Sequence, residues 1–236
     1  MRQDLSTAMA SGAAITVASN NVTIDCNDFK LGGLAAGITT TASGIMSDKV
    51  NVGVRRCRAR GFRIGIESTG AYALVEQNRL DLNTFTGIRA TGEHSIVRAN
   101  TVLDTGGRAT AVARGIDAGA PVDIIDNIIA GVASNPTANL TAYGVLLSGG
   151  TQSGSAVKGN HIRGLVPGGS GTRRGIALLS PGIAVRDNIV ALDGVTGDIG
   201  VLCSGSGVLV VQNMVIGTGA GIAYSACADG GGNASD

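Results

Sequence analysis

Two arginines and a tyrosine occupy equivalent places in the sequence, each directly before a Gly-Ile or Gly-Val pair. They are Arg114, Tyr143 and Arg174. Guanidinium groups bind carboxylates through paired hydrogen bonds, and a tyrosine between them could stack on a sugar ring. The same side chains could instead brace loop ends by cation–π contacts. We take all three as candidate substrate-binding residues, and Arg114 and Arg174 also as candidate catalytic bases.

Three charged residues lie two positions after such glycines: Glu67, Arg89 and Asp117. If these positions stack on successive strands about 4.8 Å apart, the two carboxylates are about 9.5 Å apart, near the upper limit for an inverting glycosidase. Glu67 and Asp117 are therefore a candidate acid pair, and Arg89 is a candidate binding residue. The alternative is a surface ladder of ion pairs. His161 is a further candidate general base.

A basic stripe lies two positions before the asparagine position of a second recurring motif. It comprises Arg55, Arg98, Lys158 and Arg186. A line of cations could follow an acidic polymer, and Lys158 and Arg186 are therefore candidate binding residues. The alternative is a solvated face that protects a sheet.

Two short motifs alternate strictly along the chain and would position these residues. One is apolar-x-x-Asn-x-apolar, as in VEQNRL and VRDNIV, and the other is Gly followed by Ile or Val. From each glycine to the next Asn position the gap is 12 to 16 residues, whereas the return gap varies from 8 to 17. The motif asparagines are Asn27, Asn78, Asn100, Asn127, Asn160, Asn188 and Asn213, with Cys57 in the same position of one repeat.

The repeats predict an all-β fold, a parallel β-helix of about eight coils. Apolar residues alternate with period two, which is typical of strands. Asparagines at one turn would stack into an amide ladder that is structural rather than functional. We expect an N-terminal segment over 1–14 that is a weak cap or an incomplete first coil, the β-helix over 15–225, and a flexible tail over 226–236.

The variable half of the repeat predicts loops on one edge. The segments 101–114, 128–143 and 161–174 come from three consecutive coils. Neighbouring loops would form a wall, and a wall beside a flat sheet makes a groove where ligands could bind. The alternative is a set of tolerated surface insertions.

Composition excludes several classes of function. The formal net charge is +1, so no global field favours nucleic acid. No apolar run is long enough to span a membrane, and no signal peptide is evident at the N-terminus. The four cysteines, Cys26, Cys57, Cys203 and Cys227, form no C-x-x-C pair, and we expect no metal site and no cofactor. Cys203 and Cys227 could pair, and the state of all four stays open.

The alternating Gly-Ile and Asn motifs resemble those of the right-handed parallel β-helix family, the pectin-lyase-like superfold, and in particular bacterial members. The resemblance covers about residues 15 to 225 and implies right-handed coils and a secreted, periplasmic or cell-surface location. The superfold hosts many functions. The chain lacks the adjacent Asp-Asp pair of polygalacturonase-like enzymes and the Asp-Pro-His stretch of epimerase-like ones. Asp126 and Asp187, which share a position, are separated by Gly159 and so lack the clustered carboxylates of a calcium site.

We therefore expect a protein that recognises an acidic polysaccharide along the groove beside the long loops. The first alternative is a polysaccharide lyase or glycoside hydrolase, and the second is a structural or adhesive repeat protein. Residues 1–14 cap an open β-helix end poorly, so we also expect end-to-end self-association or partial N-terminal disorder.

Overall fold

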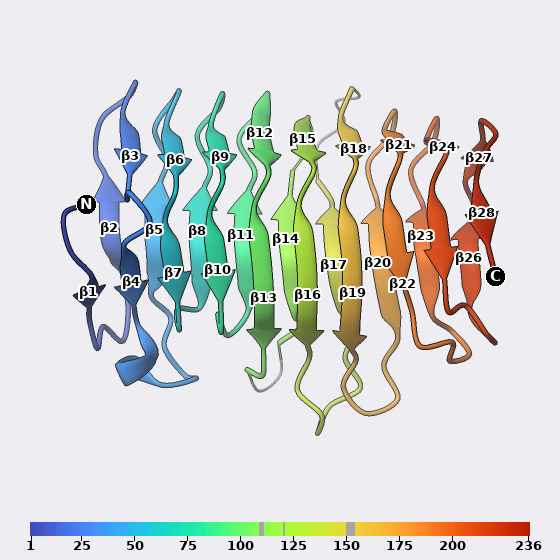
Figure 1. Ribbon diagram of the computed structural model, residues 1–236, viewed down its shortest axis with the longest axis horizontal. Coiled ribbons are helices and arrows are strands. Elements are labelled where there is room, and N and C mark those ends of the chain that lie inside the picture. The colour runs from blue at the N-terminus through green and yellow to red at the C-terminus, as the bar shows by residue number, and fades with distance from the viewer. Residues whose placement is uncertain (109–110, 120, 150–153) are drawn as a thin grey trace.

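A computed structural model describes residues 1–108, 111–119, 121–149 and 154–236. Three parallel sheets run side by side along one axis, and the chain passes through them in a fixed order (Figure 1). The described residues form a right-handed parallel β-helix, which confirms the predicted fold class. We label the three sheets A, B and C. A coil is one passage of the chain through a strand of sheet C, then of sheet A, then of sheet B. Eight complete coils run from β3 to β26 in the described part of the chain, with partial coils at each end.

The strands of each sheet follow one another along the axis. Sheet A contains β1 (Leu5–Ser6), β4 (Lys30–Gly32), β7 (Arg58–Arg60), β10 (Arg79–Asp81), β13 (Thr101–Gly106), β16 (Ile128–Ala133), β19 (His161–Val166), β22 (Ile189–Ala191), β25 (Met214–Ile216) and β28 (Ala234–Ser235). Sheet B contains β2 (Ala13–Val17), β5 (Ser43–Ser47), β8 (Ile64–Ser68), β11 (Thr86–Ala90), β14 (Arg114–Ala118), β17 (Ala142–Leu147), β20 (Arg173–Leu178), β23 (Ile199–Cys203) and β26 (Ile222–Ser225). Sheet C contains β3 (Thr23–Asp25), β6 (Gly53–Arg55), β9 (Leu74–Glu76), β12 (Ser95–Arg98), β15 (Val122–Ile125), β18 (Ala156–Lys158), β21 (Ala184–Arg186), β24 (Leu209–Val211) and β27 (Ala228–Asp229). A short 3-10 helix, η1 (Leu34–Ala36), lies between β4 and β5.

Rows of branched aliphatic side chains fill the interior. On sheet B the inward row includes Ile45, Ile66, Ile88 and Ile116, each at most 1% exposed. β-Branched residues pack well on a pleated surface, and stacking them in register buries a continuous core between the three sheets. The apolar residues that alternate with period two in the sequence therefore lie on the inner face of each sheet, and the residues between them lie on the outer face.

The turn between sheets C and A carries the predicted asparagine ladder. Its side chains are at most 2% exposed, and each Nδ2 donates to Oδ1 of the asparagine in the next coil at 2.9–3.0 Å. Each Nδ2 also donates to a backbone carbonyl, such as that of Val97 from Asn127. The ladder thus satisfies buried polar groups that would otherwise destabilise the fold. Its members are Asn78, Asn100, Asn127, Asn160, Asn188 and Asn213.

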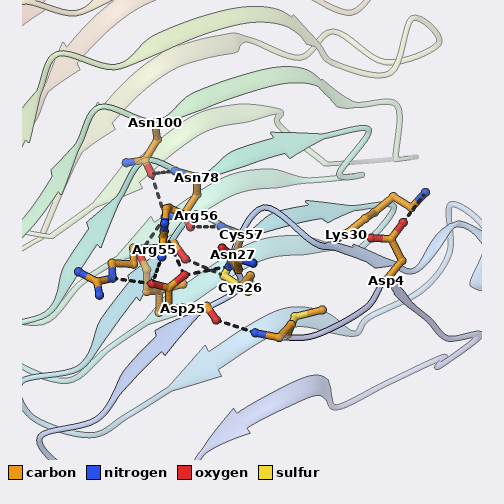
Figure 2. The surroundings of a disulfide bond; sticks show 12 residues. Asp4, Asp25, Cys26, Asn27, Lys30, Arg55, Arg56, Cys57, Asn78 and Asn100 are labelled. Carbon is orange, nitrogen blue, oxygen red and sulfur yellow. Dashed lines mark hydrogen bonds and ion pairs between the residues drawn. A yellow bond between two sulfur atoms is a disulfide. The ribbon is translucent and has the colours of Figure 1, made fainter.

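The assignment of Asn27 to this ladder was wrong. Asn27 is exposed and lies beside the disulfide that joins Cys26 to Cys57, and its own N–H donates to Asp25 Oδ1 at 2.9 Å (Figure 2). Four residues separate β3 from β4 in this coil, whereas two separate β6 from β7 in the next. The wider turn moves Asn27 outward, and the buried Cys26 takes the inner position.

The C-terminal residues also differ from expectation. Instead of a tail, 226–236 contain β27 and β28, which pair with β24 and β25. Asn233 extends the ladder, since Asn213 Nδ2 donates to its Oδ1 at 3.0 Å. A second disulfide joins Cys203 to Cys227. At the other end, β1 pairs with β4 and β2 pairs with β5, so residues before β3 extend two of the sheets.

Candidate functional site

The longest connections gather where sheet A leads into sheet B, at the lower edge of Figure 1. Part of each predicted loop is strand instead, because β13, β16 and β19 are six residues long where β7 and β10 have three. The added residues include Thr105, Val132 and Leu165, which are at most 1% exposed and extend the core. The connections proper are 107–113, 134–141 and 167–172, with two more long ones over 33–42 and 192–198. The structure describes all of these except 109–110.

Arg114, Tyr143 and Arg174 lie in register on β14, β17 and β20, as the motif spacing predicts. The arginine side chains are nevertheless engaged. Arg114 Nη1 lies 2.7 Å from Asp117 Oδ2, and Arg174 Nη1 donates to the carbonyl of Gly197. The three residues therefore form the expected column on neighbouring strands, which we call the Arg114 column. Its two guanidinium groups are each bonded within the protein and are not both free to bind one carboxylate.

Glu67, Arg89 and Asp117 occupy one row of successive strands. Arg89 Nη1 lies 3.3 Å from Glu67 Oε1, and Ser43 Oγ donates to Glu67 Oε2 at 2.8 Å. Asp117 is 6% exposed and is paired with Arg114. The two carboxylates are thus each held by an arginine, which is the geometry of an ion-pair ladder.

Around Arg63 the structure brings together four guanidinium groups, which we call the arginine cluster: Arg63 itself, and Arg89, Arg108 and Arg114, whose charges act on it. Arg63 and Arg114 lie over the Phe85 ring at 4.7 and 5.3 Å from its centroid. Sequence reasoning missed Phe85, Arg63 and Arg108 as parts of a site. Arg63 and Phe85 could have been found from spacing, because each lies two positions before its motif glycine and therefore beside the Arg114 column.

The guanidinium groups of the cluster are close enough for their positive charges to affect one another. Burial lowers the pKa of the Arg63 guanidinium, and the neighbouring charge of Arg108 lowers it further. Arg89 and Arg114 act in the same direction, whereas Glu67 opposes them. Only the carboxylates Glu67 and Asp117 form ion pairs with the cluster among the described residues, which leaves two positive charges in excess.

Several hydrogen-bonding groups of this surface have no partner in the described part of the chain. They are Arg89 Nε, Arg114 Nε and the hydroxyl of Thr86, and all three atoms are buried. Thr86 lies directly beside Arg114 in the register of β11 and β14. Unpartnered buried groups raise the free energy of the native state. Because these atoms are shielded from solvent, the feature that suits an anionic ligand is the excess positive charge of the cluster.

A hollow of about 460 Å³ lies next to the cluster on the outer face of sheet B. We call it the sheet B hollow; its lining includes Thr16, Met46, Asp48, Lys49, Glu67 and Thr69. Glu67 belongs to both places, because it lines the hollow and pairs with Arg89 of the cluster.

The other predicted binding and catalytic residues lie on different faces. Lys158 and Arg186 are neighbours on sheet C, where Arg98 of the same stripe pairs with Glu76 at 2.7 Å. His161 lies on sheet A, with its Nδ1 3.2 Å from Arg163 Nη1. The structure therefore does not bring these residues together with Arg114 and Arg174.

Among the described residues, no group of three or more His, Cys, Asp or Glu is placed to hold a metal ion. No helix in the described ranges is long and apolar enough to cross a membrane. No protein-family model, curated protein or solved structure matches this chain.

Proposed function

We propose that this protein binds an acidic carbohydrate on the outer face of sheet B, with the anionic group of the ligand at the arginine cluster. The observation that carries the proposal is the excess of positive charge in the arginine cluster, in which four guanidinium groups face only two carboxylates among the described residues. Arginine is well suited to this task because its planar donors match carboxylate, sulfate and phosphate oxygens.

We favour binding over hydrolysis as the function because the two candidate catalytic carboxylates are both in ion pairs. Glu67 and Asp117, which an inverting mechanism would need, are each tied to an arginine. A rigid β-helix with an unsatisfied cationic surface is suited to recognition, because little conformational entropy is lost when a ligand binds a preorganised site.

We also propose that the protein works outside the cytoplasm, as a secreted or cell-surface member of the pectin-lyase-like superfold. Two disulfides in a chain of 236 residues support this location, because disulfides persist mainly in oxidising compartments.

The test is calorimetric titration with two uronate oligosaccharides, one from hyaluronan and one from polygalacturonate. Arg63 and Arg108 have no carboxylate partner in the described ranges, so Arg63→Gln with Arg108→Gln removes charge without stranding an acid. We expect the double variant to bind about tenfold or more weakly, since hydrogen bonds to charged groups contribute about 1.5–3 kcal/mol each.

The matched control is Arg186→Gln on sheet C, which should bind like the wild type, with thermal unfolding confirming that both proteins are folded. Equal binding by the double variant and the wild type, or no binding of either oligosaccharide by the wild type, would refute the proposed function.

A further inference from the structure

We propose that the sheet B hollow is a second subsite, for an uncharged sugar unit, and that Glu67 is the residue that excludes an acidic unit from it. The inference rests on the proposed function and refines it: the preferred ligand alternates acidic and uncharged units instead of carrying a charge on each one.

The two subsites are contiguous. Glu67 on β8 and Arg89 on β11 are partners in the strand register, and adjacent strands lie about 4.8 Å apart. Arg89 belongs to the arginine cluster and Glu67 lines the hollow. A ligand whose anionic group meets the cluster therefore places its neighbouring unit over Glu67 and into the hollow.

The hollow has the size and lining for such a unit. Its volume of about 460 Å³ lies within the usual range of small-molecule sites. Met46 contributes apolar surface, while Thr16 and Thr69 bring hydroxyl groups at its rim. This mixture matches the carbon–hydrogen and hydroxyl surface of a sugar ring.

The charge of the hollow opposes an anion. Lys49, its one cation among the lining residues, already pairs with Asp48 at 3.1 Å. Glu67 cannot easily turn away, because Ser43 Oγ and Arg89 Nη1 each hold one of its oxygens. A carboxylate entering here would meet a fixed like charge, and juxtaposed like charges are strongly unfavourable at an interface.

The experiment compares two oligosaccharides of equal length with the wild type and Glu67→Gln. One is a hyaluronan fragment, in which every second unit is a uronate, and the other is an oligogalacturonate, in which each unit is. We expect the wild type to prefer the hyaluronan fragment. Glu67→Gln also frees Arg89 of the cluster and should therefore strengthen both complexes, but the gain in affinity should be about tenfold larger for the oligogalacturonate than for hyaluronan.

The matched control is Glu76→Gln, because Glu76 pairs with Arg98 of the next strand on sheet C just as Glu67 pairs with Arg89 on sheet B. This variant should leave both affinities unchanged. Equal gains for both ligands in Glu67→Gln, or a wild-type preference for oligogalacturonate, would overturn the subsite assignment.

Those outcomes differ from failure of the proposed function. If the wild type binds neither oligosaccharide, or if Arg63→Gln with Arg108→Gln binds like the wild type, the arginine cluster is not the anion site, and the subsite assignment falls with it.

Discussion

The backbone N–H of Cys57 donates to Oδ1 of Asn78 at 2.9 Å, the same bond that each ladder asparagine makes to the next. Cys57 thus occupies an asparagine position, but its side chain is committed to the disulfide with Cys26. The cross-link replaces the amide bonds at this end of the ladder.

This relationship predicts that an asparagine can partly replace the disulfide. Removing the cross-link as Cys26→Ala with Cys57→Ala should lower the free energy of unfolding by about 2–4 kcal/mol. Cys26→Ala with Cys57→Asn should recover about 1 kcal/mol, because the new Nδ2 can donate to Asn78 Oδ1. Urea unfolding of the two variants checks this, and identical midpoints would contradict it.

A break in the middle of the ladder should be costly. Asn127→Ala removes the acceptor of the Asn100 N–H, one of the two acceptors of Asn100 Nδ2 and one of the two donors to Asn160 Oδ1, all in the interior. We expect a loss of about 3 kcal/mol in urea unfolding. The control is Asn27→Gly, which keeps the positive φ of 50° at an exposed site and should change stability by less than about 0.5 kcal/mol. Similar losses in both variants would show that the ladder contributes little.

The ion pair of Arg173 and Asp198 offers a second stability test. Asp198 is 1% exposed, and its Oδ2 lies 2.8 Å from Arg173 Nη1. Asp198→Ala should cost about 3 kcal/mol because the backbone N–H and the Nη1 of Arg173 both lose their buried, charged acceptor. Arg173 also pairs with the exposed Asp193 at 3.1 Å, and Asp193→Ala should cost less than about 1 kcal/mol. Thermal unfolding ranks the two, and the reverse order would refute the assignment.

The ion pairs of Asp25 lead us to expect that the stability of the N-terminal end depends on pH. Hydrogen bonds from the Arg56 side chain and then from the Asn27 N–H lower its pKa from 3.8 to about 2. A lowered pKa means that the ionised carboxylate stabilises the folded state above pH 3.8, and that this stability is lost as the pH falls toward 2. Asp25→Asn should therefore unfold at a lower temperature than the wild type at pH 6.

The gap between the two melting temperatures should shrink from pH 4 and close near pH 2. A gap that stays constant over this range would contradict the assignment.

The fold could be predicted because its repeating positions carry distinctive residue types. A buried amide that bonds to its own kind in the next coil must be asparagine at nearly every turn, so the ladder shows as a period in the sequence. The width of a single turn is not encoded in that motif, which is why Asn27 was misplaced. Asn233 was missed because Gly-Gly-Gly before it and Ala-Ser after it lack the flanking apolar pattern.

The candidate site was less accessible to sequence analysis. Register alone placed Arg114 beside Tyr143 and Glu67 beside Arg89. The arginine cluster also depends on the conformations of long side chains, which strand register does not determine. It depends as well on the path of the connection that carries Arg108, and no motif specifies that path. Arg108 reaches back to the carbonyl of Thr40, a contact between residues 68 apart in sequence.

The asparagine ladder also constrains how such a protein can change in length over evolution. Every member makes the same bonds to its neighbours, so residues 79–100 could be deleted or duplicated as a block and Asn78 would still meet an asparagine. Gain or loss of a partial coil would instead put a different side chain in the column and leave amides unpaired. Insertions within the connections of the lower edge escape this constraint, so that edge is where new specificities can arise without rebuilding the scaffold.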